Sequence, residues 1–478
     1  MKLEDILLNH HKNDIYPWHM PGHKRNTDFI NLRNPYVLDI TEITGFDNLH
    51  AAKGILAKSM EKLATLYGSP HSFHLINGST CGILAAISAC THKGDKILVA
   101  RNSHKAVYNA IYLKELRPVY LMPAWDQRFG IFGSVDPQTV KKALLQHPDI
   151  KLIVLTSPTF EGIVSDIESI AEVAHSAKIP LLVDSAHGAH CGFSAGFPAN
   201  SLQQGADISV QSLHKTLPAL TQTAALHVQG NLVDVNKITS QLAIFESSSP
   251  SYVLLAAADK CVDLLLEKGG ELFAAYEKRL FNFRQKMQSL RHLTILGMAG
   301  SNIKIHPQIF CFDQGKIVVS TKWTSITGPQ LAHLLLASYQ QEVEMSATDY
   351  IIIMTSICDT DEGFDRLAAA LTEIDAMLTA AAHPPNSLNH CLLNEVVMTA
   401  YEAESHAGSW LDLSAVAGKI AQEYVYAYPP GIPLVVPGER ISDDLLQQIL
   451  HLQKKQVNLL SSSGHFPPQL LVLVDKFE

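Results

Sequence analysis

The sequence predicts an α/β fold built on a mostly parallel sheet, and the arrangement of its apolar segments is the main reason. In the first half of the chain, runs of strand length are apolar at almost every position. Strands buried on both faces show this continuous pattern rather than an alternating one. The stretches between the runs are long enough for a helix, as a crossover between parallel strands requires. These observations favour a sheet covered by helices on both faces.

The composition is that of a packed globular protein. Of the 478 residues, 47% are hydrophobic, and the formal net charge is −9. This hydrophobicity excludes disorder as the main state, and the acidic balance provides no general attraction for nucleic acids or anionic membranes. The longest apolar runs, such as residues 82–90, are much shorter than a membrane-spanning helix. The seven cysteines contain no Cys-x-x-Cys pair, which is typical of a reducing, cytoplasmic location.

The first two units of the chain differ in pattern. Residues 1–50 mix Pro, Gly, His and acidic side chains with little periodicity, so we expect an N-terminal arm with short helices. Residues 51–294 are expected to form the domain that holds the parallel sheet. Its strands are predicted at residues 72–76, 96–100, 151–155, 180–184 and 207–211.

Two smaller units are expected to follow. Residues 295–383 predict a small α+β domain, with strands at 310–312, 316–320 and 350–354 and helices near 328–340 and 362–382. Residues 381–387, which include two prolines, break the helical pattern and predict a linker. Residues 384–478 predict a C-terminal unit with an amphipathic helix near residues 413–424.

Ligands of open parallel sheets bind beyond the carboxyl ends of the strands, so the residues after each strand are the candidate site. Residues 77–82, Asn-Gly-Ser-Thr-Cys-Gly, follow the first strand and open a helix. Free backbone N–H groups, the helix dipole and the hydroxyls of Ser79 and Thr80 predict an anion site. The alternative is that one of these hydroxyls simply caps the helix.

Three further motifs follow strands. Residues 101–105, Arg-Asn-Ser-His-Lys, contain His104. Residues 184–190, Asp-Ser-Ala-His-Gly-Ala-His, begin with a carboxylate that can pair with a cationic ligand atom; Asp184, His187 and His190 are also metal-ligand types. Residues 212–216, Ser-Leu-His-Lys-Thr, contain Lys215, which can form a Schiff base with an aldehyde cofactor. Taken alone, a histidine or lysine at such a position is more typical of a solvated loop.

Taken together, the motifs match the requirements of pyridoxal phosphate. That cofactor needs an anion site for its phosphate and a lysine for its aldehyde. It also needs a carboxylate that keeps the pyridine nitrogen protonated, and it commonly has a flat side chain against its ring. The order of the motifs along the chain also fits, with the anion site first, the carboxylate later and the lysine last.

On these motifs the sequence resembles the ornithine/lysine/arginine decarboxylases, which are pyridoxal-phosphate enzymes of fold type I, and in particular their compact bacterial branch. The resemblance covers nearly the whole chain. Besides the motifs above, it includes His19-Met-Pro-Gly-His-Lys24, residues 39–49, Ser249-Pro-Ser-Tyr252 and Tyr428-Pro-Pro-Gly-Ile-Pro433. It implies an aspartate aminotransferase-like large domain with a mostly parallel seven-stranded sheet, a small α+β domain and a C-terminal α+β domain of the family's own type.

The resemblance also implies the roles of individual residues. Lys215 binds the cofactor aldehyde, Asp184 pairs with the pyridine nitrogen, and His104 stacks on the ring. His187 lies near the cofactor and the substrate, and it is a candidate general acid together with Lys215. The residues implied to bind the phosphate are Ser79, Thr80, Ser212 and His214. The loop from Ser247 to Tyr252 is implied to reach the phosphate of a neighbouring subunit, which makes a homodimer the minimal active unit.

The implied reaction is decarboxylation of a basic amino acid to its amine and CO₂, in polyamine metabolism. Arginine is favoured as the substrate, with lysine or ornithine possible. One departure is Ser185, where the family commonly has Glu. The alternatives are another fold type I enzyme (an aminotransferase or a carbon–sulfur lyase), a non-catalytic relative and, last, a metal-dependent hydrolase. The candidates for recognising the basic side chain are Asp39, Glu42, Asp47, Glu402, Glu404 and Glu439, and the sequence does not separate them.

Overall fold

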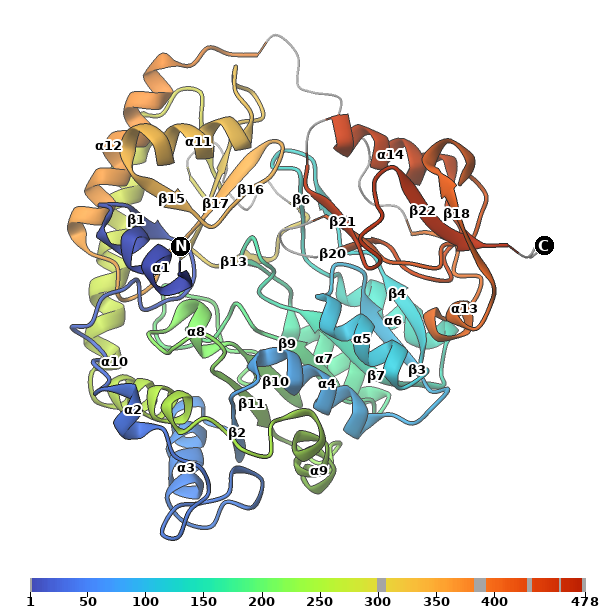
Figure 1. The fold of residues 1–478 in the computed structure, drawn as a ribbon, viewed down its shortest axis with the longest axis horizontal. Helices are drawn as coiled ribbons and strands as arrows, with labels where there is room; N and C mark the ends of the chain where they lie inside the picture. Colours follow the sequence, from blue (N-terminus) through green and yellow to red (C-terminus); the bar gives the residue numbers. More distant parts are fainter. Residues whose placement is uncertain (1, 299–306, 382–392, 428–431, 455–456, 475–478) are drawn as a thin grey trace.

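A seven-stranded sheet forms the centre of the computed structural model, which describes residues 2–298, 307–381, 393–427, 432–454 and 457–474 (Figure 1). The strand order is β2 (His71–Leu75), β11 (Ala224–Val228), β10 (Ile208–Gln211), β9 (Leu181–Asp184), β7 (Ile150–Thr156), β3 (Lys96–Ala100) and β4 (Arg117–Leu121). Strands β10, β9, β7, β3 and β4 pair in parallel, whereas β11 is antiparallel to both of its neighbours. The predicted mostly parallel sheet is therefore confirmed.

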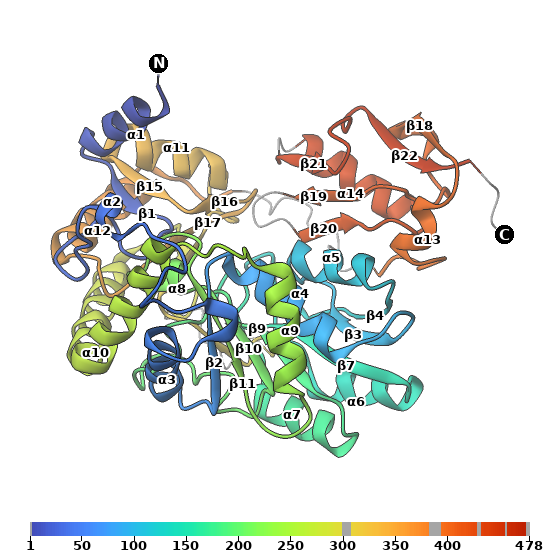
Figure 2. The same cartoon turned by 60° about the horizontal axis from the view of Figure 1, so that its bottom comes forward.

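Helices cover both faces of this sheet, which explains why apolar side chains lie on both faces of its central strands. On β3, Ile97 and Val99 face the cluster formed with α4 (Gly78–Cys90), α5 (Lys105–Leu113) and α9 (Val235–Phe245). Leu98 and Ala100 face the opposite cluster, formed with α6 (Pro137–Gln146) and α7 (Ile167–Ser176). Figure 2 shows α4 and α9 side by side on their face of the sheet.

A small antiparallel sheet lies beside the large one. Its four strands are β12 (Thr294–Ile295), β14 (Lys316–Ser320), β17 (Tyr350–Met354) and β16 (Met345–Ser346). Helices α11 (Gly328–Tyr339) and α12 (Asp361–Met377) accompany it, and the long helix α10 (Tyr252–Lys286) packs against α12. The strand predicted at 310–312 exists as β13 (Cys311–Phe312), but it pairs with β8 (Ile163–Val164) and so does not belong to the small sheet.

The N-terminal arm joins the two sheets. It contains α1 (Leu3–Lys12), β1 (Tyr16–Trp18), α2 (Pro35–Leu38) and η1 (Leu49–Ala51), and α3 (Ile55–Tyr67) follows. Strand β1 pairs in parallel with β15 (Gln341–Val343), and the buried indole N–H of Trp18 donates to the side chain of Gln341 at 2.7 Å. Further on, Gly22 lies so close to the chain after Lys215 that a Cβ would be 2.6 Å from the Leu217 carbonyl oxygen.

The C-terminal elements contain a correction to the prediction. They are α13 (Ala400–Glu404), β18 (Gly408–Asp412), η4 (Leu413–Ala415), β19 (Val425–Ala427), β20 (Ile432–Val435), α14 (Asp443–Lys454), β21 (Leu459–Ser461) and β22 (Gln469–Leu473). The predicted helix over 413–424 is wrong. After η4 the chain turns at Gly418, whose φ of +75° a helix does not allow, and Ile420 and Ala421 form β-bridges. Most of the predicted linker, and most of the 428–433 motif, lie outside the described residues.

A buried ion pair connects the C-terminal elements to the large sheet. Arg101, which follows β3, lies 3.2 Å from the Glu439 carboxylate, and both side chains are buried. Its guanidinium also donates to the Pro433 carbonyl at 2.6 Å and to the Leu434 carbonyl at 3.3 Å. Two of the motifs read in the sequence therefore meet here. No helix in the described ranges is long and apolar enough to span a membrane.

Candidate active site

The predicted lysine and aspartate lie at neighbouring strand ends. Strands β9 and β10 are parallel neighbours, with Asp184 opposite Val210. Lys215 lies on α8 (Leu213–Thr216), the single helical turn that follows β10. Asp184 is buried and accepts the backbone N–H of Ala186 at 3.1 Å. Burial raises the pKa of Asp184, and the nearby charge of Lys215 opposes that shift.

His187 connects Lys215 with a second lysine that the sequence analysis did not single out. Its Nε2 lies 3.1 Å from Lys215 Nζ, and its Nδ1 lies 3.5 Å from Nζ of Lys316, at the start of β14. The edge of the buried imidazole meets the ring of Phe160, with 5.0 Å between ring centroids. Burial, together with the two lysine charges, holds the pKa of His187 well below its usual value. The imidazole is therefore neutral around neutral pH.

Both lysines are held closer to their neutral form than in water. Burial lowers the pKa of Lys215, while the carboxylates of Asp184 and Glu344 oppose the shift. Burial also lowers the pKa of Lys316 to about 8, against the opposing charge of Asp313. A neutral amine is the nucleophilic form of lysine, so this environment prepares Lys215 to react with a carbonyl group.

The predicted anion site has its hydroxyl groups together. Ser212 donates to Ser79 at 3.0 Å, which joins the end of β10 to the first turn of α4. The N-cap position of α4 is occupied by Asn77, so Ser79 and Thr80 lie inside the first turn and neither is the N-cap residue. Gly78 adopts φ +76° and donates its N–H to the Gln222 carbonyl, which positions the turn. Thr80 is in the same first turn and is exposed.

The two remaining predicted histidines have defined tautomers. His214 Nδ1 lies 2.8 Å from the Thr223 carbonyl oxygen and therefore donates to it. His104 begins α5 and accepts the Ala106 N–H on Nδ1 at 3.2 Å, which leaves the proton on Nε2. Burial, and then the Lys215 charge, lower the pKa of His104 to about 4. For His214, burial also lowers the pKa to about 4.

Ser185, at the position where the family commonly has Glu, has a local structural role in this chain. Its buried hydroxyl donates to the Ser157 carbonyl at 2.7 Å and to the Ser201 hydroxyl at 3.2 Å. Ser201 in turn donates to Ser209 on β10. These contacts provide the three buried serine hydroxyls and the Ser157 carbonyl with hydrogen-bond partners.

The structure does not gather the residues proposed as metal ligands. His187 faces the two lysines, whereas His190 lies 3.1 Å from the carboxylate of Asp313. Asp184 bonds to the Ala186 N–H instead. These separate partners disfavour the hydrolase alternative.

None of the six acidic candidates named from the sequence lines the large cavity that Glu161 and Glu344 line, and Glu439 lines a different, small one. Asp47 accepts N–H groups at the start of α3, and Glu402 forms a capping box with Thr399. Glu404 accepts the Tyr112 hydroxyl, and Glu439 pairs with Arg101. Asp39 is exposed and Glu42 half-buried in the arm. The acidic residues missed by the sequence analysis, Glu161 and Glu344, line a cavity of about 690 Å³.

The fold and the site define a class of protein. A mostly parallel sheet with a lysine and a carboxylate at adjacent strand ends, beside paired hydroxyls at a helix start, is the arrangement of fold type I pyridoxal-phosphate enzymes. Two solved structures share this fold with the chain at a TM-score of 0.76. Lysine decarboxylase LdcF of Francisella novicida is 17% identical, with 99% of this chain and 84% of that chain covered. The constitutive lysine decarboxylase of E. coli is 18% identical, with 98% and 81% covered.

Sequence comparison identifies the family. The major domain of the Orn/Lys/Arg decarboxylases matches residues 2–329, and their C-terminal domain matches residues 389–460. Arginine decarboxylase of Bacillus subtilis is 32% identical, with 93% of this chain and 91% of that protein covered. Arginine decarboxylase of Bacillus anthracis is 33% identical over the same shares. The chain belongs to the Orn/Lys/Arg decarboxylase family.

Proposed function

We propose that this protein removes the α-carboxylate of a basic amino acid with the help of pyridoxal phosphate, releasing CO₂ and the corresponding amine for polyamine metabolism. Arginine is the favoured substrate, because relatives that match over nine-tenths of the chain are named arginine decarboxylases. The observation that carries the proposal is Lys215, a half-buried amine with a lowered pKa, 3.1 Å from a neutral histidine.

The residues present fit the cofactor. Lys215 would hold its aldehyde carbon and Asp184 its pyridine nitrogen, with His104 against the ring. The phosphate would lie at the start of α4, between the hydroxyls of Ser79, Thr80 and Ser212. When bound, the cofactor accepts the electron pair that the departing CO₂ leaves behind.

The chain's own residues provide charge and protons. The buried Asp184 carboxylate, which accepts the Ala186 N–H, would stabilise positive charge at a nitrogen placed against it. If Lys316 is an ammonium, it donates to Nδ1 of His187, and the imidazole proton then lies on Nε2, toward Lys215. This line of groups can deliver a proton at Lys215 Nζ, which is the candidate acid for the substrate Cα.

His214 has a further part in anion binding. Its Nδ1 proton is committed to Thr223, so only a protonated ring offers a donor on Nε2. A phosphate group beside it would favour that protonated form. His214 therefore adds positive charge only when the anion site is filled.

A homodimer is the assembly that we propose. The loop between α9 and α10 exposes Ser247 and Ser249, while Tyr252 anchors its end by donating to the Asp47 carbonyl at 2.5 Å. Exposed serine hydroxyls on an anchored loop suit a contribution to a neighbouring subunit's phosphate site. The free thiols of the described cysteines are in keeping with the proposed cytoplasmic location.

The test is CO₂ release by the cofactor-loaded protein from arginine, lysine and ornithine in separate reactions, with the amine identified by mass. Release from arginine with the matching amine is the expected result. A keto acid product in place of CO₂ would select an aminotransferase instead. Absence of both, with no cofactor absorbance after loading, would select the non-catalytic alternative.

A further inference from the structure

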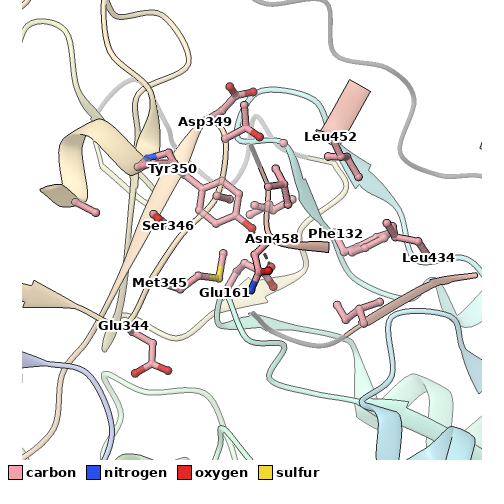
Figure 3. Close-up of a pocket in the computed structure, with 18 of the residues that line it drawn as sticks. Phe132, Glu161, Glu344, Met345, Ser346, Asp349, Tyr350, Leu434, Leu452 and Asn458 are labelled. Carbon is pink, nitrogen blue, oxygen red and sulfur yellow. Dashed lines mark hydrogen bonds between the residues drawn. The ribbon is translucent and has the colours of Figure 1, made fainter. Parts of the chain in front are cut away.

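A cavity of about 690 Å³ is lined in part by Glu344, whose charge acts on Lys215, and it is not used by the proposed chemistry. Its walls come from the small sheet, the hairpin of β5 (Trp125–Asp126) and β6 (Ile131–Phe132), and the C-terminal elements. Figure 3 shows Tyr350 pointing its hydroxyl toward Glu161 inside this cavity, with Glu344 at a separate edge.

The cavity and Lys215 are linked by a short series of contacts. Phe160 presents its ring to His187, which lies 3.1 Å from Lys215, and the next residue, Glu161, lines the cavity. Phe160 also belongs to the apolar cluster of Met345 and Tyr350, two further residues of the cavity wall. Glu344 is close enough to Lys215 for its charge to affect the pKa of that amine. These contacts connect the residues around Lys215 with the wall of the cavity.

Glu161 is an unusual residue to find in such a wall. Its side chain is buried, with 5% exposed, and its two oxygens accept from the Thr159 hydroxyl at 2.9 Å and the Tyr350 hydroxyl at 3.2 Å. Both donors are neutral. Among the described residues, no lysine, arginine or histidine forms an ion pair with it, and burial raises its pKa. A buried carboxylate without a cation is costly, so its presence beside an open cavity needs a reason.

The other charged residues of the cavity have partners of their own. Glu342 lies 3.3 Å from both His10 and His19, and Glu344 accepts the backbone N–H of Met20 at 2.8 Å. Of the cations in the wall, Arg101 pairs with Glu439, and Lys322 donates to the Gln127 carbonyl. Among the described acids that line the cavity, Glu161 is the buried one, whereas Glu342, Glu344 and Asp349 are half-buried.

We propose that Glu161, held in place by Tyr350, binds the cationic end group of the substrate side chain. This inference rests on the proposed function and extends it to the recognition of the substrate. The ligand class is an aliphatic chain that ends in a guanidinium or ammonium group. Met345 and Leu434 offer apolar surface for the methylene stem. The carboxylate pairs with the cation, and a planar guanidinium suits it best because it can donate two parallel hydrogen bonds.

The test compares arginine with citrulline, which has the same shape but a neutral end group. In Glu161→Gln, kcat/KM for arginine should fall by about 100-fold, the loss expected for one hydrogen bond between charged groups. The value for citrulline should stay within a few-fold of wild type. Tyr350→Phe should lower the preference for arginine less, because the carboxylate remains. The matched control is Asp349→Asn, which removes a half-buried acid from the cavity rim.

A binding measurement separates this proposal from the proposed function. Calorimetry should detect binding of the amine product of arginine decarboxylation to the cofactor-loaded wild type, and this binding should be lost in Glu161→Gln. If the wild type releases CO₂ from arginine but the variant keeps the wild-type ratio of arginine to citrulline, the side-chain site is wrong and the function stands. If the wild type releases no CO₂ but binds the amine only when Glu161 is present, the function is wrong and the cation site stands.

Discussion

At the scale of single residues, the site contains buried charged side chains that contact one another. Lys316 is 1% exposed, and within the described ranges no carboxylate lies at salt-bridge distance from it; its Nζ lies 3.5 Å from the imidazole of His187. In the sequence it is an ordinary lysine before an apolar strand. Only the packing of the small sheet against the large one shows that it faces the site. This is why sequence reasoning named His187 but missed the residue behind it.

Replacing Lys316 with Met should change the pH dependence of the reaction. The Lys316 charge is one of the causes that lower the pKa of His187, so its removal lets that pKa rise. The acid limb of the kcat/KM profile should then move to higher pH, and kcat should fall roughly 10- to 100-fold if the proton relay matters. The matched control is Lys96→Met, since Lys96 also begins a strand but pairs with Asp149 at the surface. An unmoved acid limb would remove Lys316 from the site.

Replacing Lys215 with Ala should abolish turnover. Without the amine, the absorbance of lysine-bound cofactor should also disappear after loading with pyridoxal phosphate. The control is Lys105→Ala, because Lys105 is exposed and lies outside the group formed by Lys215 and His187. Measurable turnover in Lys215→Ala would contradict the assignment of the lysine.

At the scale of elements, the sequence predicted the strands whose residue pattern follows from burial. It missed the segments whose conformation depends on contacts with distant parts of the chain. The strands that became β3, β7, β9 and β10 were predicted within one residue at either end, because both faces are covered and most positions are therefore apolar. The helix over 413–424 failed because bridges to Arg440 and Val472 hold that segment extended. Short β1 was also missed, since its partner β15 lies far along the chain.

Strands β2 and β11 carry a polar pair inside the sheet that makes stability depend on pH. On β11, His227 is fully buried, with its Nδ1 2.7 Å from the Ser72 hydroxyl on β2. Burial, and then the His74 charge, lower the pKa of His227 from 6.5 to about 3. Between these values the unfolded chain binds a proton that the folded chain does not. The free energy of unfolding therefore decreases as the pH falls through this window.

In His227→Gln, the free energy of unfolding should depend less steeply on pH between pH 6 and 4. One fully bound proton changes the slope by about 1.4 kcal/mol per pH unit. Urea denaturation at several pH values measures the slope. The exposed His71, at the start of β2, provides the control His71→Gln, which should keep the wild-type slope. An equal slope in both variants would mean that His227 is protonated in the folded protein.

At the scale of the whole molecule, the pair of Arg101 and Glu439 holds the C-terminal elements near the site. Arg101 is only three residues before His104. A displacement of this ion pair would therefore move His104 through the loop after β3. Sequence reasoning ranked Glu439 among the acids that might recognise substrate. Its burial against Arg101 and the hydrogen bond that it accepts from Asn394 at 2.8 Å assign it to this structural ion pair instead.

Glu439→Gln should lower the free energy of unfolding by about 3–5 kcal/mol, because it leaves the Arg101 guanidinium buried without a counter-charge. The double variant Arg101→Met, Glu439→Gln should recover part of the loss, since no unpaired charge remains. Urea denaturation of the three proteins gives both values. The double variant could instead lose a further, similar amount of free energy of unfolding relative to Glu439→Gln. That result would show that the arginine acts mainly through its hydrogen bonds to the Pro433 and Leu434 carbonyls.

The pairing of β1 with β15 also affects how the protein can be made. The contact between Trp18 and Gln341 spans 323 residues of chain. At about 5–20 residues per second, a ribosome needs roughly 15–65 s to travel that far. Throughout this time the arm has no strand to pair with, and the indole that the finished protein buries completely remains exposed on the nascent chain. The lysine turn that Gly22 contacts is thus synthesised well before β15, the strand that holds the arm in place.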